Sequence, residues 1–110
     1  MDSQLRRGIL EACVLAVLEK GESYGYQLVK DISAFIEITE STLYPILKRL
    51  EQTELLIVYS KEYNGRLRKY YSITDKGREK ITDLLEDWQK IVEIYHFIVD
   101  ERRERENNND

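Results

Sequence analysis

Residues 41–51 read Ser41-Thr42-Leu43-Tyr44-Pro45-Ile46-Leu47-Lys48-Arg49-Leu50-Glu51, and this stretch decides the fold that we expect. Its apolar side chains recur at steps of three and four residues, as on one face of a helix: Leu43, Ile46, Leu47 and Leu50. Glu40 or Ser41 is expected to start this helix. Pro45 then falls within its first turn or so, where a missing amide donor costs little. The stretch therefore predicts a helix with one buried apolar face and one exposed polar face.

Two further helices precede this one. Residues 5–18 carry apolar side chains on more than one side, which predicts a largely buried first helix. A glycine stop at Gly21 follows, and Ser23 is expected to cap a second helix that begins near Tyr24. The second helix has a single apolar stripe, formed by Tyr24, Leu28, Val29 and Ile32. Phe35 and Ile36 are candidates to extend this stripe. Residues 36–39 are β-branched and alternating, which favours an extended connection to the third helix.

A β-hairpin is predicted after the third helix. Residues 55–60 and 68–74 have the composition of strands, and Asn64-Gly65 between them is typical of a tight turn. Tyr70 and Tyr71 are adjacent in the second strand and must lie on opposite faces. We expect one of them in the core, while the other remains a candidate for contact with a phosphate.

One long helix is expected to start at Thr74-Asp75, which is a capping signal. Apolar side chains recur along it at alternating steps of three and four residues: Ile81, Leu84, Leu85, Trp88, Ile91, Val92, Tyr95 and Ile98. Such a stripe requires a partner surface, so residues 75–100 are predicted to be a dimerisation helix. Residues 101–110 are charged and rich in asparagine, which favours a polar, disordered tail.

The predicted fold class is therefore mostly α-helical with a small β-hairpin. Three helices followed by a basic hairpin are the element order of a winged helix-turn-helix, which we assign to residues 1–74 as a DNA-binding domain. In this fold the third helix enters the major groove, and the hairpin, or wing, lies along the adjacent backbone or minor groove. The long C-terminal helix is an addition to it.

Composition excludes several other classes of function. A chain of 110 residues is expected to form one domain, with no room for a separate catalytic domain. No segment is apolar enough to span a membrane, and Met1–Gln4 do not resemble a secretion signal, so the expected location is the cytoplasm. The single cysteine, Cys13, is expected to be a small buried hydrophobe. The single histidine, His96, has no second ligand nearby, so we expect no metal, no cofactor and no catalytic residue.

The net charge of the chain is -4, but the charges are unevenly distributed. Residues 41–74 carry six basic and three acidic side chains, a net charge of +3, whereas both flanking segments are acidic. Attraction to phosphates is local, because salt screens it within roughly 10 Å. A basic surface on the middle third is therefore compatible with binding to double-stranded DNA.

Two groups of residues are the candidates for contact with DNA. The exposed face of the third helix combines hydroxyls, an aromatic ring and two cations: Ser41, Thr42, Tyr44, Lys48 and Arg49. The second group is the turn of the hairpin and the three cations that follow it: Asn64 and Gly65, with Arg66, Arg68 and Lys69. A winged-helix adaptor that binds proteins and reads no DNA is the alternative, because the outer thirds of the chain are acidic.

Three motifs in order resemble the PadR family of transcriptional regulators over most of residues 5–98. They are Tyr24-Gly25-Tyr26, the stretch of residues 41–51 quoted above, and residues 65–77 with Gly65-Arg66, Arg68-Lys69-Tyr70-Tyr71-Ser72-Ile73-Thr74 and Gly77. The resemblance implies a homodimeric repressor that binds a short inverted repeat and is released by a small ligand. Its length and single C-terminal helix resemble the short subgroup of that family.

The resemblance also implies roles for individual residues. Thr42, Tyr44, Pro45, Lys48 and Arg49 would lie on the recognition helix, Tyr24 would contact the DNA backbone, and Gly65, Arg66 and Arg68 would form the wing. One residue departs from the family pattern: Glu54 stands where the family commonly has glycine. The end of the third helix must then be capped by another residue or in a strained geometry.

Trp88 has two interpretations. A tryptophan in a buried helical stripe is first of all packing area. The resemblance implies instead that Trp88 lines a flat apolar pore at the dimer centre, where a planar aromatic effector stacks. Val14, Val17 or Leu18 of the first helix would then share the wall of that pore.

Overall fold

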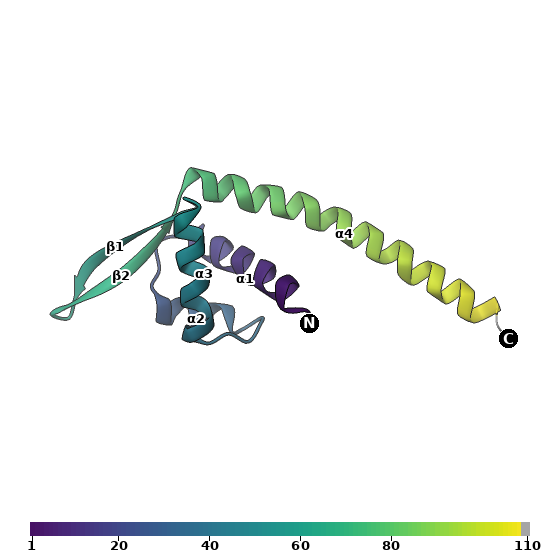
Figure 1. The fold of residues 1–110 in the computed structure, drawn as a ribbon, viewed down its shortest axis with the longest axis horizontal. Helices are drawn as coiled ribbons and strands as arrows, with labels where there is room; N and C mark the ends of the chain where they lie inside the picture. Colours follow the sequence, from purple (N-terminus) through teal and green to yellow (C-terminus); the bar gives the residue numbers. More distant parts are fainter. Residues whose placement is uncertain (109–110) are drawn as a thin grey trace.

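A computed structural model describes residues 1–108, and its elements follow the order expected from the sequence (Figure 1). The helices and strands are α1 (Ser3–Leu18), α2 (Gly25–Ile32), α3 (Glu40–Gln52), β1 (Leu56–Tyr63), β2 (Arg66–Ile73) and α4 (Asp75–Asn108). The fold class is confirmed: a mostly helical winged helix-turn-helix with a two-stranded hairpin and a long C-terminal helix.

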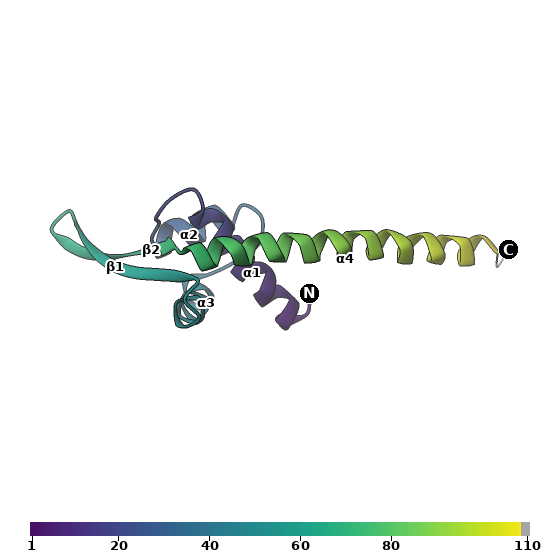
Figure 2. The same ribbon diagram turned by 90° about the horizontal axis from the view of Figure 1, so that it is seen from above.

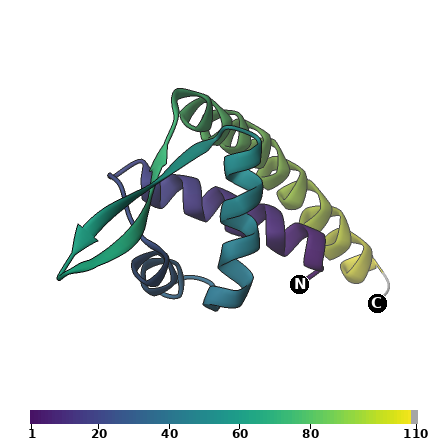
Figure 3. The ribbon, with the colours of Figure 1, turned by 60° about the vertical axis from the view of Figure 1, so that its left-hand side comes forward.

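The core lies where α1, α2 and α3 meet the base of the hairpin. Figure 3 shows α3 crossing in front of α1, with α2 and the hairpin on the same side of both. The fully buried side chains come from all of these elements: Leu10, Val14, Leu15, Leu18, Leu28, Ile32, Leu43, Leu47, Leu50 and Leu56. The apolar face predicted for α3 is therefore the face that packs inward.

The start of α2 differs from the prediction. Ser23 does not cap this helix, because its backbone N–H and C=O pair with Tyr71 of β2 at 3.0 and 2.8 Å. Tyr24 occupies the capping position in an extended conformation, without a hydrogen bond from its side chain to the helix. The helix ends at Ile32, so Phe35 lies beyond it and is 91% exposed rather than part of the apolar stripe.

The hairpin closes through a two-residue turn at Asn64 and Gly65, with φ angles of 50° and 79°. Both residues are left-handed, as in the turns whose twist matches that of paired strands. Pairing therefore continues up to Tyr63 and Arg66, and the strands are longer than predicted. Tyr70 and Tyr71 lie on opposite faces as expected: Tyr71 is 5% exposed and belongs to the core, whereas Tyr70 is only half-buried.

The end of α3 adopts the strained cap. Glu54 has a φ of 64°, a left-handed conformation that L-residues other than glycine adopt at a cost. The amide of Glu54 donates to the carbonyl of Glu51, and the amide of Leu55 donates to that of Leu50, both at 2.9 Å. These two bonds form a Schellman motif, which reverses the chain and directs it into β1.

The first turn of α4 is joined to this motif. The hydroxyl of Thr74 donates to the carbonyl of Glu54 at 2.7 Å and accepts from the amide of Gly77 at 3.0 Å. A Cβ atom on Gly77 would lie 2.2 Å from the carbonyl oxygen of Leu55. Only glycine allows α4 to begin this close to the backbone at the base of the hairpin.

The remainder of α4 projects far beyond the core (Figures 1 and 2). The described chain extends over 70 × 26 × 21 Å and has a radius of gyration of 18.1 Å, against about 13 Å for a globular chain of this length. None of the helices described between residues 1 and 108 is long and apolar enough to traverse a lipid bilayer.

The predicted tail is partly helical. Residues 101–108 continue α4 instead of being disordered, and residues 109–110 lie outside the described part. Glutamate and arginine are good helix formers, and they alternate here so that Arg102 and Glu106 pair at 3.6 Å one turn apart. Low hydrophobicity was therefore an insufficient reason to end the helix at residue 100.

Replacing Glu54 by glycine is expected to stabilise the protein. The left-handed conformation costs a non-glycine residue roughly 1–2 kcal/mol, and the entropy that glycine loses on folding offsets roughly 0.5–1 kcal/mol of the gain. Urea unfolding should show a free energy of unfolding higher by about 0.5–1 kcal/mol for Glu54→Gly. Glu54→Ala keeps the Cβ atom and should gain nothing. Equal gains from both variants would assign the effect to the carboxylate instead of the backbone.

Candidate nucleic-acid interface

The outer face of α3 presents the polar side chains that the sequence placed there. Ser41, Tyr44, Pro45 and Lys48 are exposed, and Thr42 is half-buried. The hydroxyl of Thr39, which precedes the helix, lies 2.9 Å from that of Ser41. Pro45 is the sixth residue of α3 and so lies in the second turn, not the first. Because proline has no amide donor, the carbonyl of Ser41 lacks its helical partner.

The aromatic ring of Tyr44 lies directly over the start of α2. A Cβ atom on Gly25 would be 2.5 Å from the hydroxyl oxygen of Tyr44 and 3.0 Å from its ring carbon Cζ. Gly25 is therefore the residue that lets α3 place this ring against α2. The approach brings the first turn of α2 and the middle of α3 to one surface.

A groove of about 470 Å³ runs between these two helices and the wing. The lining residues include four that the sequence assigned to DNA contact, Tyr24, Tyr44, Arg68 and Lys69, together with Tyr26, Glu40 and Leu67, which it did not. The structure thus brings together side chains from α2, α3 and β2. Asn64, Gly65 and Arg66 lie further out, at the exposed end of the hairpin.

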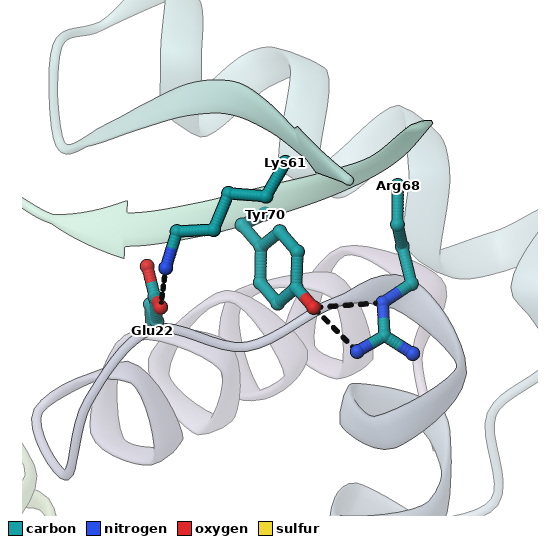
Figure 4. A network of polar contacts seen from close by, with 4 residues as sticks. All are labelled: Glu22, Lys61, Arg68 and Tyr70. Carbon is teal, nitrogen blue, oxygen red and sulfur yellow. Dashed lines mark hydrogen bonds and ion pairs between the residues drawn. The ribbon is translucent and has the colours of Figure 1, made fainter. Parts of the chain in front are cut away.

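Arg68 lies within a cluster of tyrosines, of which Figure 4 shows Tyr70. Its guanidinium carbon is 3.5 Å from the ring centre of Tyr24, 3.9 Å from that of Tyr63 and 5.0 Å from that of Tyr70. Its Nε and one terminal nitrogen both donate to the hydroxyl oxygen of Tyr70, the former at 3.0 Å. Cations are attracted to the faces of aromatic rings at these distances. We call Tyr24, Tyr63 and Tyr70 the tyrosine cage.

Lys61 has partners on the same face of the hairpin. Its ammonium nitrogen forms an ion pair with Glu22 and lies 5.2 Å from the ring centre of Tyr70 and 5.7 Å from that of Tyr59 (Figure 4). Lys61 and Arg68 therefore both contact groups within the protein. Arg66 and Lys69 are exposed, and within residues 1–108 their side chains make no hydrogen bond or ion pair.

Arg49 is also engaged within the protein. Its Nε lies 3.4 Å from a carboxylate oxygen of Glu11 in α1. That oxygen is buried and has no hydrogen bond within the described chain, so Arg49 is the charge that compensates it. The position of Arg49, on the side of α3 that faces α1, separates it from Lys48 on the outer face.

Two cations near α3 were not assigned from the sequence. Arg6 and Arg7 of α1 line a groove of about 300 Å³ together with Thr42 and Pro45 of α3. The guanidinium of Arg6 donates to the carbonyl of Glu37, in the connection that precedes α3. The sequence signal that could have identified these two cations is that they are adjacent arginines near the start of α1. The structure thereby places cations on the side of α3 opposite the wing.

Three titratable groups have shifted pKa values. Desolvation raises the pKa of Tyr71, with smaller contributions from Tyr44 and Glu51. Burial likewise raises the pKa of the half-buried Cys13 thiol, which makes it a poor nucleophile. For Arg68, partial desolvation lowers the pKa, but the hydrogen bonds to Tyr70 and the neighbouring phenol oxygens raise it by more, so this side chain remains a cation.

The apolar stripe of α4 is only partly covered by its own chain. Leu85, Ile91, Val92 and Tyr95 are exposed, whereas Leu84 and Trp88 pack against the edge of the core. Ile81 is 4% exposed and belongs to the core of its own protomer, because the first turns of α4 lie on β2 and α1. Its assignment to a dimer interface is therefore corrected.

An apolar groove of about 460 Å³ lies beside Trp88. The α1 residues that line it are Gln4, Leu5, Gly8 and Ile9, and the α4 residues are Leu84, Trp88, Ile91 and Val92. Val14 and Leu18 are not among them, because they point to the opposite side of α1 and are fully buried in the core. Their assignment to a ligand site is therefore corrected. The described residues contain no cluster of side chains suited to a metal ion.

Comparison with known proteins identifies a family of transcriptional regulators. The model of a family described as "Transcriptional regulator PadR-like family" matches residues 14–83. The negative transcriptional regulator PadR of Bacillus subtilis (strain 168) is 29% identical over 90 residues, which cover 77% of this chain and 50% of that protein. The chain thus spans half the length of this relative.

Solved structures resemble the chain over most of its length. The crystal structure of a PadR family transcriptional regulator from Eggerthella lenta has a TM-score of 0.79 and 34% sequence identity, with 87% of this chain and 86% of that chain covered. The crystal structure of Bacillus subtilis PadR in complex with operator DNA has a TM-score of 0.64 and 27% identity, with 70% and 46% covered.

Proposed function

The chain belongs to the PadR-like family of transcriptional regulators, and from this we propose that it is a homodimeric repressor that binds an inverted-repeat operator in double-stranded DNA. Residues 1–74 would bind DNA, and the helix that starts at residue 75 would join the two protomers. The family is one of regulators, and we propose no enzymatic activity for the chain.

The arrangement around α3 supports this proposal most directly. An exposed helix face that carries hydroxyls, an aromatic ring and a cation suits the edges of base pairs in a major groove. Arg66 and Lys69 lie on one side of it and Arg7 on the other, where the phosphates that border the groove would be. The base contacts would come from Ser41, Thr42, Tyr44 and Lys48. Tyr24 and the wing tip at Asn64-Gly65 would lie along the backbone.

The uncovered surface of α4 supports a dimer. The described chain exposes 8321 Å², against about 6,400 Å² for a monomeric protein of its mass. The exposed surface includes a run of apolar side chains on α4: Ile91, Val92, Ile94, Tyr95, Phe97 and Ile98. A stable interface buries about 800 Å² on each partner, which this surface can supply. A dimer would also set the distance between two recognition helices at about 34 Å, one turn of DNA.

Release from DNA by a small planar aromatic effector is the regulatory part of the proposal. The groove beside Trp88 is apolar and lies at the presumed interface, so a bound ligand would contact both protomers. An effector changes the spacing of the recognition helices only if it binds one arrangement more tightly than the other.

Binding to DNA is tested with a fragment from upstream of the gene, titrated against salt in excess unrelated DNA. We expect nanomolar, strongly salt-dependent binding that survives competition. Arg66→Ala should weaken binding to all sequences and lower the salt slope by about one unit, because a phosphate contact is lost. Lys90→Ala removes a cation from α4 and should leave the slope unchanged. If the unrelated DNA displaces the protein completely from the upstream fragment, the result would support the protein-binding adaptor instead.

Dimerisation is tested with Ile91→Asp. Ile91 is 57% exposed in the protomer, so the carboxylate should not disturb the protomer core but would be buried unpaired in the interface. Light scattering should report monomers that no longer bind operator DNA. Gln89→Asp introduces the same charge on a polar side of α4 and should remain dimeric. A stable Ile91→Asp dimer would contradict the assigned interface.

The effector site is tested through the fluorescence of Trp88, the only tryptophan in the chain. Planar aromatic compounds that release the operator should quench this fluorescence over the same concentration range, because they stack on the ring. Trp88→Ala should retain DNA binding and lose the response. Release that persists in this variant would place the effector elsewhere.

A further inference from the structure

We propose that Arg68 is a positioning residue that clamps the wing to the start of α2 and does not itself contact DNA. The inference rests on the proposed function, because the wing matters only if DNA is bound. It distinguishes Arg68 from Arg66 and Lys69, the two neighbouring cations of the same strand.

The register of the hairpin separates Lys69 from Arg68. Lys61 and Arg68 are directly opposite each other, and Tyr59 and Tyr70 form the next pair on the same face. Arg66 lies on this face too, opposite Tyr63 and nearer the turn, so it differs from Arg68 by its exposure and not by its face. Glu22 and Tyr24, which precede α2, contact this face through Lys61 and Arg68 respectively. Lys69 lies on the opposite face of β2 because side chains alternate along a strand.

The contacts of Arg68 occupy one side of its donor fork and the plane of its guanidinium. Two of its nitrogens donate to the hydroxyl of Tyr70, and its plane lies within stacking distance of Tyr24 and Tyr63. A bidentate phosphate contact uses two parallel N–H donors of the same fork. A phosphate contact through the side of the fork that carries Nε would require Arg68 to give up the bonds to Tyr70.

The wing depends on these contacts because its outer part projects beyond the core (Figure 1). Its attachment to residues 22–24, which precede α2, includes neighbouring links: Glu22 with Lys61, the backbone of Ser23 with Tyr71, and Tyr24 with both Arg68 and Tyr70. Arg68 also contacts Tyr63, which directly precedes Asn64, so the link through Arg68 extends to the turn. Arg68 therefore fixes the angle of the wing, and with it the positions of Arg66 and Lys69.

The salt dependence of operator binding separates the two roles. If Arg68 positions the wing, Arg68→Lys keeps the charge but loses the planar stacking, so affinity should fall about tenfold with an unchanged salt slope. Arg68→Ala should behave in the same way. Lys69→Ala, the matched control, should lower the slope by about one unit. Arg68→Lys with wild-type affinity, together with a lower slope for Arg68→Ala, would overturn the proposal.

Amide hydrogen exchange of the DNA-free protein provides a second readout. Loss of the clamp in Arg68→Lys should accelerate exchange in residues 61–70 about tenfold, while amides of α1 and α3 keep their wild-type rates. Lys69→Ala should leave exchange in the hairpin unchanged. Unchanged exchange in Arg68→Lys would refute the clamp whatever the DNA result. Faster hairpin exchange in a protein that binds no DNA would retain the clamp and reject the proposed function.

Discussion

The close backbone contact between Leu55 and Gly77 is the constraint on which the rest of the structure depends. A Cβ atom at Gly77 would lie 2.2 Å from the carbonyl of Leu55, so no other residue fits without displacing backbone. The left-handed Glu54 turns the chain from α3 into β1, and Thr74 bonds both to that turn and to the first turn of α4. The end of α3, the base of the hairpin and the start of α4 are therefore joined at one point. Their relative directions follow from it.

The charge of the molecule shows why total charge is a poor guide to its function. The chain is acidic overall, at -4, yet the surface around α3 carries outward-facing cations on both sides. Several other cations are occupied within the protein: Arg49 by Glu11, Lys61 by Glu22 and Arg68 by the tyrosine cage. Only the cations without internal partners can exchange counterions for DNA phosphates at no cost to the fold. The number of arginines and lysines in the middle third therefore overstates the number of phosphate contacts.

The sequence predicts elements whose signals are local, and it misses features that depend on the packing of distant segments. Helical spacing identified the inner face of α3, and Asn64-Gly65 identified the turn, because both reflect backbone preferences. Because Glu54 stands where the family commonly has glycine, the sequence predicted that α3 ends either in a cap made by another residue or in a strained geometry. The strained geometry is observed. The partners of Arg68 were beyond this reasoning, since they require the hairpin register and its position against residues 22–24. Val14 and Leu18 were misplaced for a related reason: periodicity shows that α1 is buried but not which side meets α4.

The joined base of the wing also determines how a change at α4 would reach the DNA-binding surface. Because α4 is capped by Thr74, which directly follows β2, a rotation of α4 in the proposed dimer would move the base of the hairpin with it. The Schellman motif at Glu54 connects the same point to the C-terminal end of α3. A closely packed junction of this kind transmits rotation as a rigid body, since close-packed interiors leave little room for strain to relax. The tyrosine cage then holds the outer part of the wing at a fixed angle to α2. In the proposed dimer, a ligand between two α4 helices would therefore alter the spacing of the two α3 helices without deforming either domain.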